Sequence, residues 1–212
     1  MNSDIRNFSA KRDRLFLSIV DLSVIIEAIY SHLMVRSDQP LIPPRSWIAL
    51  TPAHCTKLLA LPVSANFPDV AMFDKIERIS IKFVNPPRDI DMVAVEKGPG
   101  SLSRSLNRMV ASIYLRFYET YRPWWVERFN RDEATWPPIM RFARIVRNAA
   151  GHQMRIDWNS QNVAAVNWRG LTYSHADNGR EIIGGDLVAA DILFLMLDLS
   201  DELDTLGCPF EP

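Results

Sequence analysis

The segment from Trp136 to Asp157 carries the strongest helix signals in the chain and most constrains its fold. Pro137 and Pro138 suit a first helical turn, where no backbone N–H partner is lost, and Thr135 before them is a candidate N-cap. A helix is therefore expected to begin near Pro137. One mostly apolar face recurs at spacings of three and four, as a buried helix face does. Its residues are Ile139, Phe142, Val146, Ala149 and Gln153.

A second stripe of the same predicted helix is basic. At the same helical spacing it contains Arg141, Arg144, Asn148, His152 and Arg155. Arg147 flanks this stripe, and Asn148 and His152 are four residues apart, so their side chains are expected to meet on one surface. The small residues Ala149–Gly151 lie between them. They would allow another helix or a ligand to approach the backbone closely.

These residue types suit cleavage of a phosphodiester without a metal. Imidazole titrates near neutral pH unperturbed, so His152 is the candidate general acid and base. Guanidinium is always charged and its fork matches two phosphate oxygens, so Arg147 is the candidate phosphoryl clamp. Asn148 is expected to orient the imidazole ring or to hold a ribose or phosphate oxygen. The remaining basic residues are expected to bind flanking RNA phosphates: Arg141, Arg144 and Arg155.

Residues Arg147–His152, with the sequence RNAAGH, resemble the Arg-Asn-x-x-x-His form of the Arg-x4–6-His motif of the HEPN superfamily. The resemblance covers these six positions only. It implies an all-helical bundle that dimerises, with two motifs facing each other in one composite, metal-independent endoribonuclease site. It also implies attack by the ribose 2′-hydroxyl, a cyclic phosphate product, and a toxin–antitoxin or phage-defence setting. A cognate antitoxin or regulator is a further candidate partner, and no cofactor or metal is expected.

Other interpretations of the same residues remain open. A HEPN-like domain that does not cut would use the basic stripe to bind nucleic acid or a protein partner. A structural or antitoxin-type assembly protein would use Ala149–Gly151 for close helix packing. Arg147 could also pair with an acidic residue of a neighbouring helix, with His152 as a structural histidine. The nuclease is favoured because an arginine, an asparagine and a histidine on one helix surface are more than packing requires.

The composition limits the remaining classes of protein. At 212 residues the chain suits one domain, or one domain with an appended piece, and 48% hydrophobic residues are ample for a core. A net charge of −1 argues against non-specific coating of nucleic acid, so an RNA site has to be local. Cys55 and Cys208 are far apart and form no Cys-x-x-Cys pair, which argues against a disulfide scaffold or a zinc site and indicates a reducing cytoplasm. His54 and Cys55 are expected to pack rather than to bind a metal.

The rest of the chain also predicts helices. The apolar segment 9–36 is interrupted by Asp21, Glu27 and His32, so a buried helix is expected and not a membrane span. Further helices are predicted from Thr51 through Leu59, over residues 68–83 and 101–121, and after Asp186 as a cap. Residues 88–100 are expected to be irregular or briefly extended.

Two short stretches alternate like strands. Val163–Trp168 and Leu171–Tyr173 flank a tight turn and predict a small β-hairpin before the last helix. Arg169, Tyr173 and His175 are candidates for lining an RNA path.

The segment between residues 120 and 138 is rich in tryptophan and arginine. Such side chains can stack unpaired bases, although a packed corner between helices or a dimer contact is favoured. The tryptophans and arginines concerned are Trp124, Trp125, Trp136, Arg122, Arg128 and Arg131. The sequence thus predicts one HEPN-like domain over residues 1–212. Its fold is expected to be an all-α bundle of about five or six helices with a small hairpin, acting as a homodimer.

Overall fold

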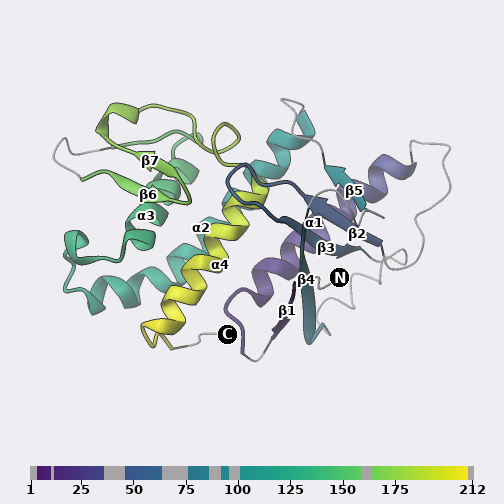
Figure 1. Cartoon of the computed structure of the whole chain (residues 1–212), viewed down its shortest axis with the longest axis horizontal. Helices are drawn as coiled ribbons and strands as arrows, with labels where there is room; N and C mark the ends of the chain where they lie inside the picture. The colour runs from purple at the N-terminus through teal and green to yellow at the C-terminus, as the bar shows by residue number, and fades with distance from the viewer. Residues whose placement is uncertain are drawn as a thin grey trace. The chain divides into compact units, whose positions relative to one another are not determined.

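The computed structural model describes residues 4–10, 12–35, 46–63, 76–85, 92–95, 101–158 and 164–209. The chain divides into two compact units, coloured by residue number in Figure 1. Unit 1 contains residues 1–51, 56–97 and 210–212, and unit 2 contains residues 52–55 and 98–209. One domain over residues 1–212 stays a prediction.

Unit 1 is a mixed α/β structure, so the predicted all-α fold is wrong. Its five-stranded sheet has the order β1-β4-β3-β2-β5. The first four strands are antiparallel neighbours, and β5 pairs with β2 in parallel. One helix, α1, contacts β3 and β4. The bounds are β1 Asp4–Ser9, α1 Phe16–Val35, β2 Ser46–Leu50, β3 Leu58–Val63, β4 Arg78–Val84 and β5 Met92–Val95.

Strand β4 occupies the C-terminal part, residues 78–83, of the segment predicted as a helix over residues 68–83, so that prediction is wrong there. Its sequence RISIKFV alternates, with Ile79 and Ile81 buried and Arg78 exposed. Ile79 lies opposite Phe8 of β1, which is also buried. Successive strand side chains point to opposite faces, so this period of two fits a half-buried strand. Residues 64–75 lie outside the described residues.

Strands β2 and β3 form the centre of the sheet. Leu58, Leu59, Ala60 and Leu61 are all buried, and Ile48 of β2 lies opposite Leu61. Strands buried on both faces show no alternation and cannot be distinguished from a short helix by pattern. The helix predicted through Leu59 is therefore wrong. The brief extended segment expected within residues 88–100 is confirmed over the described residues 92–95 as β5.

Helix α1 confirms the buried helix predicted over residues 9–36, although it begins only at Phe16. Leu15, Ile19, Leu22 and Ile26 recur at helical spacing and are buried. No helix in the described part of the chain is both long enough and apolar enough to cross a membrane.

Unit 2 holds three further helices and a hairpin (Figure 1). Helix α2 contacts α3 and α4, and α3 also contacts α4 and strand β6. The hairpin of β6 and β7 confirms the prediction. Helix α2 is longer than predicted, and α4 begins later than the expected Asp186 cap. The bounds are α2 Ser101–Arg128, α3 Pro138–Gly151, β6 Val166–Trp168, β7 Leu171–Tyr173 and α4 Ala189–Thr205.

Aromatic side chains fix α3 inside unit 2. The Tyr114 hydroxyl of α2 donates a hydrogen bond to the Ala143 carbonyl at 2.6 Å. The Phe142 ring stacks on Tyr173 of the hairpin with 5.5 Å between centroids. Trp125 and Trp136 are buried and lie edge to face at 6.2 Å, so the packed-corner interpretation is confirmed for both.

The carboxylate of Asp191 attaches residues 52–55 to the start of α4. Asp191 is fully buried and accepts hydrogen bonds from the backbone N–H groups of Ala53 and His54 at 2.9–3.0 Å. It also accepts the Val188 N–H at 3.1 Å, which satisfies one of the free donors at the helix N-terminus. Residues 52–55, which lie in the sequence between β2 and β3 of unit 1, therefore belong to unit 2.

Candidate functional site

Helix α3 begins where its prolines predict and ends earlier than expected. Pro137 is the N-cap, while Thr135 lies in a preceding turn of 3₁₀ helix and does not cap α3. The helix stops at Gly151, because His152 leaves helical geometry with φ −123° and ψ 61°. Gln153 and Met154 then have φ of +56° and +67°, in the left-handed region. The prediction of a continuous helical stripe from Arg141 to Arg155 is therefore wrong beyond Gly151, where the helix ends.

Arg147 lies between α3 and α2. Its Nε is 2.5 Å from Glu119 Oε1 of α2, as the structural interpretation expects. Its Nη1 donates to the Asn148 side-chain oxygen at 3.3 Å, so Arg147 and Asn148 are in contact. About a third of the Arg147 side chain, 34%, stays exposed. The guanidinium is thus oriented by a neighbouring carboxylate, while part of the Arg147 side chain stays exposed.

His152 lies at the C-terminal end of α3 with an accessible imidazole. Its side chain is 56% exposed, and Nδ1 is 3.4 Å from Asp157 Oδ2. A carboxylate at Nδ1 favours the proton on that nitrogen, which leaves Nε2 as the group that can accept a proton from a ligand. The imidazole is not in apolar packing. Its pairing with Asp157 is one that sequence analysis did not assign.

The predicted meeting of Asn148 and His152 on one helical surface is not observed. No hydrogen bond joins these two side chains in the described structure, since the helix ends between them. Ala149 is buried, but a Cβ built on Gly151 would meet nothing within 4 Å. The surface beside Gly151 is therefore open within the part of the chain that the structure describes, which leaves room for a ligand or a second chain.

Arg141 and Arg144 belong to a hollow on one side of α3. This hollow of about 280 Å³ is also lined by Glu133, whose Oε1 is 2.8 Å from Arg144 Nε. The Nε of Arg141 is buried and has no hydrogen-bond partner among the residues that the structure describes. Glu133, which was not predicted from the sequence, therefore neutralises Arg144. Arg141 instead has an unsatisfied N–H donor.

Arg155 belongs to a different hollow. It donates to the Gly179 carbonyl and pairs with Glu181, both at 2.9 Å. The hollow measures about 630 Å³ and is also lined by Arg104 and Arg108 of α2. Neither residue was singled out in the sequence, although their spacing of four on a predicted helix places them on one face. The basic stripe is therefore divided between two separate hollows.

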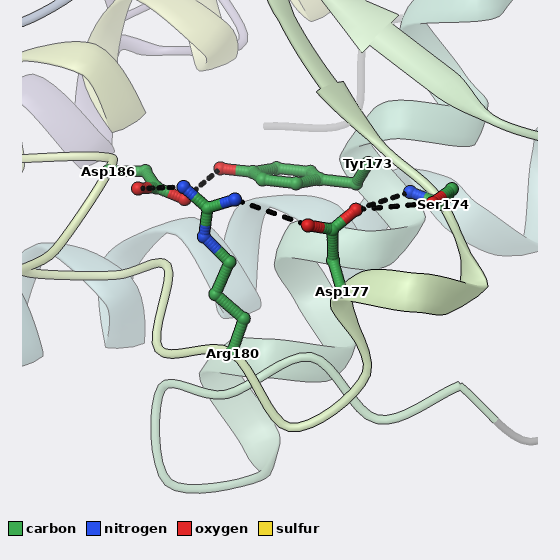
Figure 2. Close-up of polar contacts among 5 residues, drawn as sticks. All are labelled: Tyr173, Ser174, Asp177, Arg180 and Asp186. Atoms are coloured by element: carbon green, nitrogen blue, oxygen red, sulfur yellow. Dashed lines mark hydrogen bonds and ion pairs between the residues drawn. The ribbon is translucent and has the colours of Figure 1, made fainter.

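Two of the hairpin residues suggested for an RNA path, Tyr173 and Arg169, bind acidic residues of unit 2. The buried Tyr173 donates through its hydroxyl to Asp186 at 3.1 Å, and Arg180 bridges Asp186 and Asp177 at 2.8 and 3.1 Å (Figure 2). Burial raises the pKa of the Tyr173 hydroxyl well above its ordinary value.

Arg169 and the third suggested residue, His175, are accounted for in the same region. Arg169 makes two bonds of 2.8 Å to Asp198 of α4, while His175 lies half-buried in a short 3₁₀ turn. Asp177 accepts the backbone N–H of Ser174 at 2.9 Å and closes that turn (Figure 2).

The pair His54 and Cys55 shows packing geometry. His54 Nε2 lies 3.1 Å from the Asp186 carbonyl oxygen. Burial raises the pKa of the Cys55 thiol to about 11, so this thiol is a poor nucleophile at neutral pH. Within the described ranges, no cluster of three or more His, Cys, Asp or Glu side chains could hold a metal ion.

Comparison of the chain with protein-family models, with curated proteins and with solved structures finds no match. The similarity to HEPN domains therefore depends on the six residues Arg147–His152, all of which lie in unit 2.

Proposed function

We propose that unit 2 is a metal-independent endoribonuclease of single-stranded RNA that acts as a homodimer in the cytoplasm. The observation that carries this proposal is the exposed imidazole of His152, which pairs with Asp157 through Nδ1 at 3.4 Å. An oriented guanidinium, Arg147, precedes it by five residues at the open end of α3. The resemblance of Arg147–His152 to the HEPN motif supports the same chemistry.

In this mechanism His152 Nε2 takes the proton of a ribose 2′-hydroxyl, and the resulting oxygen attacks the adjacent phosphorus. The bond from phosphorus to the 5′-oxygen breaks as that oxygen receives the proton from the imidazolium of His152, which leaves a 2′,3′-cyclic phosphate and a 5′-hydroxyl. Asp157 stabilises the protonated imidazole. Arg147 balances the charge that builds on the phosphoryl oxygens, and Asn148 holds its Nη1.

A second copy of the chain is part of the proposal. The open surface beside Gly151 gives a second α3 room to approach, so that two His152 side chains would share one cleft. A cognate antitoxin or regulator, and a role in toxin–antitoxin or phage-defence systems, are proposals that come from the resemblance alone.

A binding module that does not cut RNA is the second candidate. The specific observation in its favour is the pairing of Arg147 with Glu119, which occupies the Nε edge of the proposed clamp. Such a module would retain the arginines as phosphate contacts and would not need His152 as a base.

Cleavage of single-stranded RNA in excess chelator tests the two candidates. The wild-type chain should cut, and His152→Ala should reduce the rate at least about 100-fold, as loss of a general acid or base does. His175→Ala is the matched control, because His175 is a half-buried histidine of unit 2 that lies outside the six-residue motif in the sequence. RNA binding without cleavage by the wild-type chain would select the binding module, and activity lost on chelation would reject the metal-free mechanism.

A further inference from the structure

We propose that the 630 Å³ hollow beside α3 is a binding site for a nucleotide, with the phosphate held by arginines of α2. The walls come from the start of α2, the turn after α3 and the segment before α4, all within unit 2. The inference does not depend on cleavage at His152.

The charge of the hollow points to an anion. Arg104 and Arg108 are four residues apart on α2, and their guanidinium groups have no hydrogen bond or ion pair with any residue that the structure describes. Arg155, by contrast, is paired with Glu181 at 2.9 Å. Two arginines without an acidic partner therefore line one cavity, which is the arrangement that binds a phosphate through charge-assisted hydrogen bonds.

The wall behind the two arginines is rigid. Asn107 lies between them in sequence, is only 6% exposed, and accepts the Ala189 N–H at 2.8 Å. Its side-chain nitrogen would be 3.3 Å from a Cβ on Gly184, whose φ of +88° favours glycine. Asn107 thus connects α2 to the start of α4 and to the segment around Gly184. The arginines project from a fixed backbone, which lowers the entropy cost of binding.

The size and remaining lining favour a nucleotide over a bare phosphate. Cavities that bind small molecules measure roughly 300–1,000 Å³, and this one lies within that range. The half-buried Met154 supplies apolar surface for a base or sugar, while Ser103 and Gln153 supply hydrogen-bonding groups. The nucleotide could be free, or it could be one unit of an RNA strand. Both sources present the same phosphate chemistry.

Calorimetric titration of the full chain with uridine monophosphate, uridine, inorganic phosphate and a short RNA oligonucleotide tests the site. We expect binding of the monophosphate and none of uridine. The double variant Arg104→Ala/Arg108→Ala should weaken binding at least about tenfold. Arg128→Ala, at the other end of α2 and also exposed, should leave affinity unchanged. Glu181→Gln should tighten binding, because it removes the one carboxylate of the hollow.

The choice of ligands distinguishes a free nucleotide from an RNA strand, and the variants separate nucleotide binding from RNA cleavage. Binding of the oligonucleotide alone, sensitive to Arg104 and Arg108, would assign the hollow to an RNA strand. Binding of the monophosphate would assign it to a free nucleotide. Absence of both, or an equal effect of Arg128→Ala, would overturn the site. His152→Ala should retain nucleotide binding, so a failed cleavage assay and a failed binding assay remain separate results.

Discussion

The buried carboxylate of Asp191 allows a quantitative prediction for Asp191→Ala. The substitution removes the acceptor for three backbone N–H groups, those of Ala53, His54 and Val188. Loss of the N-cap interaction at Val188 costs about 1 kcal/mol. Each of the two loop donors costs about 1 kcal/mol more, a low value because Ala53 and His54 lie near solvent and can bind water. The free energy of unfolding should therefore fall by about 3 kcal/mol.

Equilibrium urea unfolding, followed by tryptophan fluorescence and circular dichroism, measures this loss. Asp191→Asn keeps one acceptor oxygen and should cost about half as much. Glu202→Gln, on the same helix and half-buried, makes the same change of charge and should stay within about 0.5 kcal/mol of the wild type. If Asp191→Ala cost no more than Glu202→Gln, the attachment of residues 52–55 to α4 would be refuted.

Two further perturbations address the site and the hairpin. In Glu119→Gln the guanidinium of Arg147 loses an ion pair between side chains that are 34% and 38% exposed, so stability should fall by less than about 1 kcal/mol. The released charge should raise RNA affinity about two- to fivefold in a filter-binding assay, and unchanged affinity would contradict a phosphate contact by Arg147. The pKa of Tyr173 is raised by burial, so its hydroxyl stays protonated when folded at a pH where the unfolded chain ionises. Unfolding free energy should therefore decrease as pH rises above about 10. The decrease of unfolding free energy with pH should be smaller in Tyr173→Phe. Urea unfolding of both proteins, repeated across that pH range, measures the difference.

Local sequence signals predicted unit 2 better than unit 1. Prolines 137 and 138 located the start of α3, and the turn at Arg169-Gly170 located the hairpin, because both depend on backbone preferences of single residues. The alternation of Ile79, Ile81 and Phe83 was also a usable strand signal. It was misread because the preceding apolar residues allow a helical spacing to be drawn through the same positions.

Pairing between distant residues could not be predicted. Arg147 and Glu119 are 28 positions apart, and their contact depends on how α2 and α3 pack. Strands β2 and β3 are buried by neighbours on both faces, so their sequence carries no period. The early end of α3 was signalled weakly by Gly151, but the left-handed backbone at Gln153 and Met154 was not, since neither is a residue type that prefers it.

The termination of α3 at Gly151 has a consequence for the course of any bound polynucleotide. The last carbonyls of a helix carry partial negative charge and repel anions. A strand bound by both Arg144 and Arg155 should therefore keep its phosphates toward these arginines and away from the last carbonyls of α3.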